Sequence, residues 1–217
     1  NETNALVATD TQGKTLFISG LRQKVASKRT RQFRKRVKNR LTTRKAEGKG
    51  TRSVRRVLKR LGRRQSNRTH TFVQTSVKQL CTWAKPNSIL VFEDLDMPQR
   101  KRRGKKQRSL NRRLACWPYG MFLSWAKQKA VEFGHEVVLV DPAYTSQTCS
   151  RCGALGTRSR HSFKCVCGLQ EHADINASIN IRNKFVTLRG NGIQSIIPEA
   201  LVVHTTEGKP PPKGGGS

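Results

Sequence analysis

One short stretch decides the fold class: Ser88-Ile-Leu-Val-Phe-Glu-Asp-Leu95. Its unbroken apolar run, Ile89 to Phe92, consists of β-favouring residues, so we expect a strand that is buried on both faces. A second strand of this kind is predicted over 136–140, and amphipathic helices are predicted over 72–83 and 117–133. Strands that alternate with helices in this order indicate the α/β class.

The first third of the chain adds a hairpin and two basic helices to this pattern. Short apolar runs at 5–8 and 15–18 flank a turn over 10–13, which predicts a β-hairpin. Apolar residues then recur at helical spacing within 22–68, so two basic helices are expected there. We expect the break between them near Gly48-Lys-Gly50.

The charge of the chain indicates a polyanionic partner. Its 217 residues include 44 Lys and Arg against 13 Asp and Glu, which gives a formal net charge of +31. Residues 22–68 hold 21 of the basic residues and a single acid, Glu47. Such a one-signed run repels itself unless a phosphate backbone neutralises it, so we expect nucleic acid to bind there. A membrane surface is the competing partner, but no stretch approaches the roughly 18 apolar residues of a spanning helix, and no N-terminal signal peptide is recognisable.

Two further segments are expected to lack regular structure. Residues 97–113 form a second basic block with no acid, interrupted by Gly104, and are predicted to be a mobile loop. After residue 186 the periodicity is lost and the chain ends in a Pro- and Gly-rich stretch. We therefore expect 186–217 to be a flexible tail or linker.

Four of the six cysteines form the pattern of a metal site. Cys149-Ser-Arg-Cys152 and Cys165-Val-Cys167 are two tight turns that supply two thiolates each. Zinc prefers four such ligands in a tetrahedron, and a closed four-thiolate site is structural, so we expect one zinc ion that folds a small ribbon. Four free cysteines or a redox dithiol are the alternative. Cys81 and Cys116 stand alone and are expected to be small buried side chains, a cysteine usage typical of a reducing compartment.

Two acids lie where a catalytic metal site could form. Glu93 ends the first predicted strand, and Asp174 opens a predicted helix that begins at Ala173. Carboxylates at strand and helix ends can hold two divalent ions about 3.5–4 Å apart, which activate water and stabilise the leaving oxygen in phosphodiester hydrolysis. Spacing alone is a weak signal, because a strand-end Glu is more often a solvated cap.

Three segments resemble a known family. They are Val91-Phe-Glu-Asp-Leu95, Val140-Asp-Pro-Ala-Tyr-Thr-Ser-Gln-Thr-Cys-Ser-Arg-Cys-Gly153 and Glu171-His-Ala-Asp-Ile-Asn-Ala-Ser-Ile-Asn-Ile181. Together they resemble the C-terminal half of the TnpB transposon-encoded nucleases, which the compact type V CRISPR effectors share. The resemblance covers roughly residues 1–185, and the second segment is far more specific than two cysteines at this spacing.

The resemblance implies an RNase-H-like (RuvC) α/β fold with an inserted zinc ribbon and a basic helical insertion. It implies magnesium-dependent cleavage of target DNA under a guide RNA, in the cytoplasm or nucleoid of a prokaryote, with two magnesium ions. In this family Glu93 matches the second RuvC acid and Asp174 the third. The expected organisation is a nuclease core over 1–144 with its insertion at about 22–68 and its basic loop at about 97–113, a target-binding zinc ribbon over 145–170, a last RuvC helix over 171–185, and the tail over 186–217.

The first acid of the family has no counterpart here. It lies on a first strand, in a Gly-Ile-Asp-like motif just before the hairpin, whereas this chain opens at Asn1-Glu-Thr-Asn4, which resembles the residues after that motif. Asp10 is nearby, but we expect it to be a turn residue. We therefore expect a fold that lacks its first strand in this chain, a chain inactive by itself, and an N-terminal remainder of the protein as its partner.

Three functions remain open on the sequence. The first is the nuclease portion of an RNA-guided DNA endonuclease, and the second is a nuclease-inactive, RNA-guided module that represses DNA by occupying it. The third is a zinc-ribbon nucleic-acid-binding protein unrelated to nucleases, which leaves the surroundings of Glu93 and Asp174 unexplained. In each case the residues expected to contact nucleic acid are Arg55, Arg56, Arg63, Arg64, Arg102 and Arg103.

Overall fold

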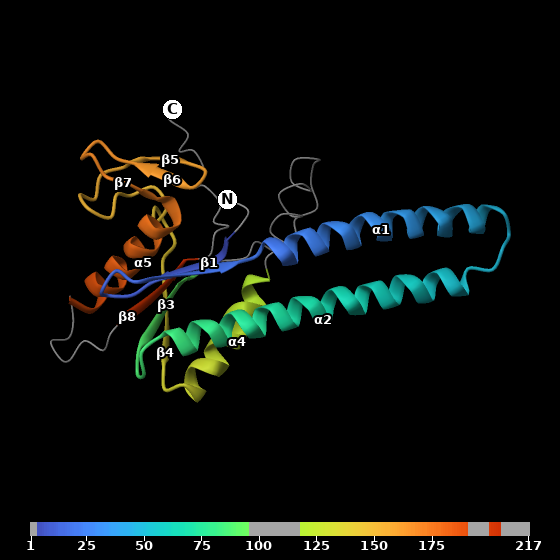
Figure 1. Cartoon of the computed structure of the whole chain (residues 1–217), viewed down its shortest axis with the longest axis horizontal. Coiled ribbons are helices and arrows are strands. Elements are labelled where there is room, and N and C mark those ends of the chain that lie inside the picture. The colour runs from blue at the N-terminus through green and yellow to red at the C-terminus, as the bar shows by residue number, and fades with distance from the viewer. Residues whose placement is uncertain (1–3, 96–117, 191–199, 205–217) are drawn as a thin grey trace, which may run out of the picture.

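The computed structural model of the chain describes residues 4–95, 118–190 and 200–204 (Figure 1). A five-stranded sheet carries helices on both faces, a long pair of helices projects from it, and a small three-stranded sheet lies beside the start of the last helix. The elements in chain order are β1 (Asn4–Thr9), β2 (Thr15–Ser19), α1 (Leu21–Ala46), α2 (Arg52–Trp83), β3 (Ile89–Glu93), α4 (Tyr119–Glu132), β4 (Glu136–Val140), β5 (Thr157–Ser159), β6 (Ser162–Lys164), β7 (Gln170–His172), α5 (Ala173–Gly190) and β8 (Ala200–His204).

The large sheet is mixed and has the order β2-β1-β8-β3-β4. Strands β1 and β2 form the predicted antiparallel hairpin, and β3 and β4 are parallel with Glu93 paired to Val140. The expected α/β class is therefore confirmed, as are the hairpin, the strand over 89–93 and the helix that is α4. The strand over 136–140 forms as well, but the prediction that it is buried on both faces is wrong, because β4 is an edge strand of the sheet and only Val140 is buried.

The segment that we expected to be a flexible tail contributes to this sheet. Helix α5 continues to Gly190, and β8 lies between β1 and β3, antiparallel to the first and parallel to the second. The prediction of a tail is thus wrong for 186–190 and 200–204, while 191–199 and 205–217 lie outside the described residues. Four apolar residues, Ala-Leu-Val-Val, are too short a run to distinguish a strand from a linker by pattern.

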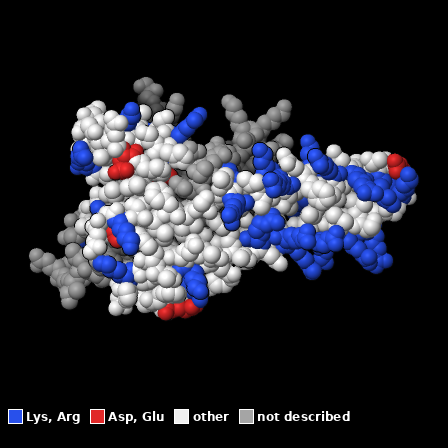
Figure 2. All heavy atoms as spheres, in the orientation of Figure 1, with Lys and Arg blue, Asp and Glu red and all other residues white. Residues whose placement is uncertain are grey.

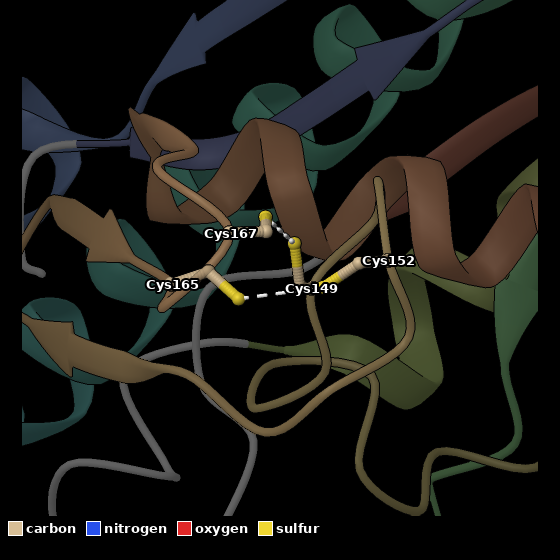
Figure 3. A group of neighbouring side chains, drawn as sticks. All are labelled: Cys149, Cys152, Cys165 and Cys167. Carbon is tan, nitrogen blue, oxygen red and sulfur yellow. Dashed lines mark hydrogen bonds between the residues drawn. The ribbon is translucent and has the colours of Figure 1, made fainter.

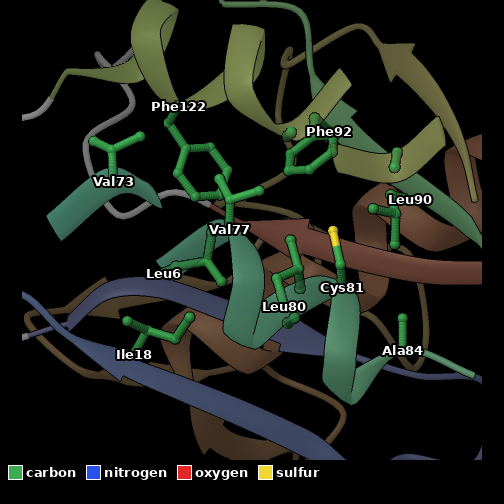
Figure 4. Packing of buried hydrophobic residues seen from close by; sticks show 13 residues of the cluster. Leu6, Ile18, Val73, Val77, Leu80, Cys81, Ala84, Leu90, Phe92 and Phe122 are labelled. Carbon is green, nitrogen blue, oxygen red and sulfur yellow. The ribbon is translucent and has the colours of Figure 1, made fainter. Parts of the chain in front are cut away.

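One face of the sheet packs on α2 and α4. Side chains alternate along a strand, so Leu90 and Phe92 of β3 face these two helices. They join Val77 and neighbouring residues of α2 and Phe122 of α4 in the main core (Figure 4). The Phe92 and Phe122 rings meet edge to face with centroids 5.9 Å apart, a favourable aromatic geometry.

The opposite face of the sheet is covered by α5. Ile89 and Val91, the other side of β3, pack against Ile181 and Phe185 of that helix. All five residues of β3 are buried, as predicted for a strand enclosed on both faces. The layer between the sheet and α5 also contains the residues of the candidate site.

The two basic helices project away from the sheet as an antiparallel hairpin (Figure 1). The predicted break near residues 48–50 is confirmed, because α1 ends where Gly48 takes a φ of 68°, a conformation that glycine adopts without the usual steric cost. Helix α2 is one continuous helix, so the segment predicted over 72–83 is its C-terminal part. That part is buried in the main core, while the N-terminal part pairs with α1.

The hairpin is held partly by polar contacts and carries much of the basic surface. Gln23 Nε2 donates to Thr69 Oγ1 at 2.9 Å, and Gln65 Nε2 donates to Ser27 Oγ at 2.7 Å. Figure 2 shows Lys and Arg side chains along both helices, with few acids near them. None of the helices in the described ranges is long and apolar enough to cross a membrane.

Candidate metal centres and carboxylate site

The four predicted zinc ligands come together at one point (Figure 3). Their sulfur atoms all lie within 4.8 Å of one another, with Cys149 and Cys167 3.7 Å apart and Cys152 and Cys165 3.5 Å apart. Sulfurs bound about 2.3 Å from a tetrahedral zinc ion lie about 3.8 Å apart, so these two separations fit zinc. These separations are much longer than a disulfide bond, so neither pair is disulfide-bonded, and the convergence of four thiols at one point favours a metal site over a redox pair.

Two glycines shape the turns that present these cysteines. Gly153 and Gly168 have φ values of 77° and 83°, and their N–H groups donate to the carbonyl oxygens of Cys149 and Cys165. A third glycine, Gly156, lies where a β-carbon would clash with the Phe163 ring. Phe163 is the only large, fully buried side chain of the described ribbon, whose core is therefore very small.

Two thiols of the cluster differ in their pKa. Burial opposes ionisation of Cys149, but the backbone N–H groups of Cys152 and Arg151 outweigh it and lower the pKa of this thiol to about 7. The Cys167 N–H favours ionisation of Cys165, yet burial and the neighbouring sulfurs raise the pKa of that thiol to about 12. Within the cluster, Cys149 is therefore the first thiol to lose its proton, and Cys165 keeps its proton to higher pH. A zinc ion would displace these protons.

Glu93 lies at the end of β3, almost completely buried. Its Oε1 accepts a hydrogen bond from the Thr145 hydroxyl at 2.5 Å, and its backbone carbonyl accepts one from the Tyr119 hydroxyl. Burial, followed by the nearby charges of Glu93 and Asp94, raises the pKa of Tyr119, so this hydroxyl stays protonated and remains a donor. Glu93 is thus oriented from β3, α4 and the segment after β4, and is no solvated strand cap.

A chain of buried and partly buried hydrogen bonds connects Glu93 to the cysteine cluster through α5. Asn180 Nδ2 donates to the carbonyls of Thr145 and Thr148, and Asn176 Nδ2 also donates to Thr148. Asn176 Oδ1 accepts from the N–H of Ser150, inside the first cysteine turn. The two asparagines therefore fix the 145–150 segment, and with it the Thr145 hydroxyl that holds Glu93.

Asp174, the other predicted acid, is fully buried near the start of α5. Asp174 lies two helical turns before Ile181, so both side chains are on the same face of α5. Ile181 packs against Ile89 and Val91 of β3. Because side chains alternate along a strand, Glu93 is on the same face of β3 as these two residues. Both acids therefore belong to the layer between the sheet and α5. The direct partner of Asp174 is Arg158 of β5, whose Nη2 lies 2.7 Å from Oδ1.

Two histidines that the sequence did not single out surround the same acid. His161 lies in the turn between β5 and β6, and His172 ends β7. One possible metal-ligand atom of each histidine lies within 4.8 Å of a carboxylate oxygen of Asp174. Among the described residues, Glu93 is not part of any comparable group of three or more possible metal ligands. Burial lowers the pKa of His172, which keeps this imidazole neutral at neutral pH. His172 lies inside the motif quoted for Asp174, whereas nothing in the sequence signals that His161 and Arg158 lie beside it.

The remaining predicted residues fall in three groups. Asp10 is a turn residue as expected, because its Oδ1 accepts from the N–H groups of Gln12 and Lys14 at 2.9 and 2.7 Å. Four of the arginines are exposed on α2: Arg55, Arg56, Arg63 and Arg64. Arg102 and Arg103 lie outside the described residues, together with the expected basic loop and Cys116.

Comparison with known proteins identifies a matching family and several similar proteins. Residues 119–181, which contain the whole cysteine cluster, match the family described as "Cas12f1-like, TNB domain". The chain is 41% identical over 75 residues to the CRISPR-associated endodeoxyribonuclease Cas12f1 of Sulfoacidibacillus thermotolerans, covering 33% of this chain and 18% of that protein. It is 38% identical over 99 residues to a TnpB-like protein of Aquifex aeolicus, covering 42% of this chain and 31% of that protein.

The fold is also similar to a solved structure, described as the Cas12f1-sgRNA-target DNA complex. The TM-score is 0.57 at 20% identity, with 83% of this chain and 50% of that chain covered. The chain thus spans less than a third of the two relatives and half of the solved chain. The family match and the two relatives agree that the chain is similar to the TnpB-like proteins and to the compact type V CRISPR effectors, and the solved structure shows a similar fold.

Proposed function

We propose that this chain supplies the nuclease part of an RNA-guided, magnesium-dependent DNA endonuclease with an RNase-H-like (RuvC) fold, acting inside a prokaryotic cell. The observation that carries the proposal is the burial of Glu93 and Asp174 in one layer between the sheet and α5. Burying two carboxylates is costly unless they are compensated, which is typical of sites that bind cations. The TnpB-like and endodeoxyribonuclease relatives support the reaction class.

Glu93 and Asp174 are the type of ligand that magnesium binds, because this hard ion prefers oxygen ligands. Bound magnesium would activate water and stabilise the leaving oxygen of a phosphodiester. The task of the protein is to hold the ligands: the Thr145 hydroxyl fixes Oε1 of Glu93, and α5 presents Asp174. To coordinate a metal ion through Oδ1, Asp174 must also give up its ion pair with Arg158.

The ligand count explains why we expect this chain alone to be inactive. Two carboxylates are few for two ions, and the strand beside β3, Ala200-Leu-Val-Val-His204, contributes no acid. We infer that a further aspartate comes from an N-terminal part of the complete protein, in line with the family's first RuvC acid. Guide RNA and target DNA would complete the assembly.

The test is cleavage of a guide-matched duplex by the chain alone and by the chain joined to the N-terminal part of its parent protein, each with guide RNA. We expect negligible cutting by the chain alone, and guide-dependent cutting by the joined protein that stops when a chelator removes magnesium. Efficient cutting by the chain alone would contradict the ligand count.

A nuclease-inactive, RNA-guided DNA-binding module is the second candidate. The ion pair between Arg158 and Asp174 favours it, because a carboxylate neutralised by an arginine is a weaker ligand for magnesium. Under this alternative the joined protein binds guide-matched DNA tightly and leaves it uncut at every magnesium concentration.

We further propose that the helical hairpin binds the nucleic-acid backbone. Reversing the charge of its four exposed arginines, Arg55, Arg56, Arg63 and Arg64, should weaken binding to all sequences alike. The slope of log affinity against log salt should fall by about one for each arginine that contacts a phosphate. Lys127→Glu on α4 is the control: it makes the same change in charge per residue away from the hairpin and should have a much smaller effect. An affinity that stays flat between about 50 and 200 mM salt would rule out this electrostatic binding.

A further inference from the structure

The surroundings of Asp174 contain more than the proposed magnesium site requires. His161, His172 and Asp174 come from the β5–β6 turn, the end of β7 and the start of α5, and each offers a ligand atom within 4.8 Å of the others. The backbone holds this group together, because the N–H of Ala173 donates to the His161 carbonyl at 2.6 Å. The two imidazole rings lie side by side, with centroids 5.3 Å apart and planes 25° apart.

Two buried atoms of this group have no hydrogen-bond partner among the described residues. They are Nδ1 of His161 and Oδ2 of Asp174. Buried polar atoms normally have a hydrogen-bond partner, so each such atom needs an explanation, and a bound ion is one. Oδ2 lies 3.9 Å from Nδ1 of His172, whereas two such atoms bound about 2.1 Å from a tetrahedral ion would lie about 3.4 Å apart. A bound ion would draw these atoms together, and at Nδ1 of His172 it would replace the 3.3 Å hydrogen bond that this nitrogen accepts from the Asp174 N–H.

We propose that His161, His172 and Asp174 bind a divalent first-row transition-metal ion that prefers imidazole, such as Zn²⁺ or Co²⁺. Two imidazole nitrogens and one carboxylate are a common ligand set for such ions, whereas Mg²⁺ prefers oxygen ligands alone. The site is separate from the four-cysteine cluster, since it shares no ligand with it. It shares Asp174 with the proposed magnesium site, so an ion bound at either site takes a carboxylate that the other site uses. The proposal does not rest on the nuclease function, because it concerns binding only.

Arg158 should limit the affinity of this site. Its guanidinium occupies Oδ1 of Asp174, which leaves Oδ2 facing the histidines. The arrangement orients the carboxylate, as hydrogen bonds to metal ligands commonly do. It also places a positive charge near the ion, so removing that charge should strengthen ion binding by about tenfold or more.

The experiment is a titration of Co²⁺ into protein whose cysteine cluster already holds one Zn²⁺. Co²⁺ bound to nitrogen and oxygen absorbs weakly in the visible range and lacks the strong near-ultraviolet band of cobalt thiolates, so the two sites can be told apart. Wild-type protein should bind one Co²⁺ with the nitrogen and oxygen signature. His161→Gln and His172→Gln should each weaken this binding at least about tenfold.

The control variant is His70→Gln, which removes an exposed histidine of α2 and should bind Co²⁺ as the wild type does. Retention of one Zn²⁺ per chain shows that each variant still folds its ribbon. Arg158→Gln should bind Co²⁺ more tightly, a gain that misfolding cannot produce. The proposal is overturned if wild-type protein takes up no Co²⁺ at about 1 mM, or if His161→Gln and His172→Gln bind it as well as His70→Gln does.

Discussion

Replacing Glu93 by glutamine should lower guide-directed DNA cleavage by about a thousandfold or more in the protein joined to its N-terminal part, with little change in DNA affinity. The substitution removes a charged metal ligand and keeps the size of the side chain. It removes no phosphate contact, because Glu93 is buried at the end of β3. The measurement is the single-turnover cleavage rate of a guide-matched duplex, with affinity measured in parallel.

Asp174→Asn should have a similar effect on cleavage and an additional effect on stability. The amide cannot neutralise Arg158, so the melting temperature should fall as well. Because the Arg158 side chain is 24% exposed, water can solvate the freed guanidinium, and the chain should remain folded.

Two further variants separate catalysis from structure. Asp10→Asn is the matched control, because its side-chain oxygen still accepts from Gln12 and Lys14 at the hairpin turn, and cleavage should be unchanged. Thr145→Val removes the hydrogen bond to Oε1 of Glu93 without removing a ligand, so its loss of activity should be clearly smaller than that of Glu93→Gln. Robust cutting by Glu93→Gln, or loss of cutting in Asp10→Asn, would overturn the assignment of the acids.

Cys149→Ser should abolish stoichiometric zinc binding and unfold the ribbon. The ribbon has almost no hydrophobic core besides Phe163, so its folding free energy must come largely from the metal, which contributes about 10–16 kcal/mol in small zinc-binding peptides. Hydrogen exchange should show loss of protection over 145–172, while α1, α2 and β3 stay protected. The wild-type protein should contain one zinc ion per chain by elemental analysis.

Cys81→Ser is the matched control for this prediction. Cys81 is buried in the main core on α2 and lies in no group of metal ligands among the described residues. Burial raises the pKa of its thiol to about 11, as expected for an inert cysteine in an apolar core. This variant should keep its zinc and lose some global stability. A Cys149→Ser protein that keeps one zinc and a protected ribbon would contradict the structural role of the metal.

Local patterns predicted much of this protein. The apolar run of β3, the breaker glycine at 48 and the two cysteine turns each determine their own conformation, because the decisive interactions lie within a few residues. The same holds for Asp10, whose side chain bonds to its own turn. The clustering of the four cysteines could be predicted for this reason, and the two carboxylates could be singled out because their segments resemble a known family.

Contacts between distant segments were decided only by the tertiary structure. A run of four apolar residues near the C-terminus gave no sign that β8 pairs with β1 and β3, nearly 200 and about 110 residues away in sequence. Likewise, Arg158 and His161 reach Asp174 because the pairing of β5, β6 and β7 folds the ribbon back beside the start of α5. Spacing in the sequence determines which side chains lie in the same turn or on the same face of an element. The pairing of strands and the packing of the ribbon on α5 determine which side chains from distant segments come into contact, as Arg158 and Asp174 do.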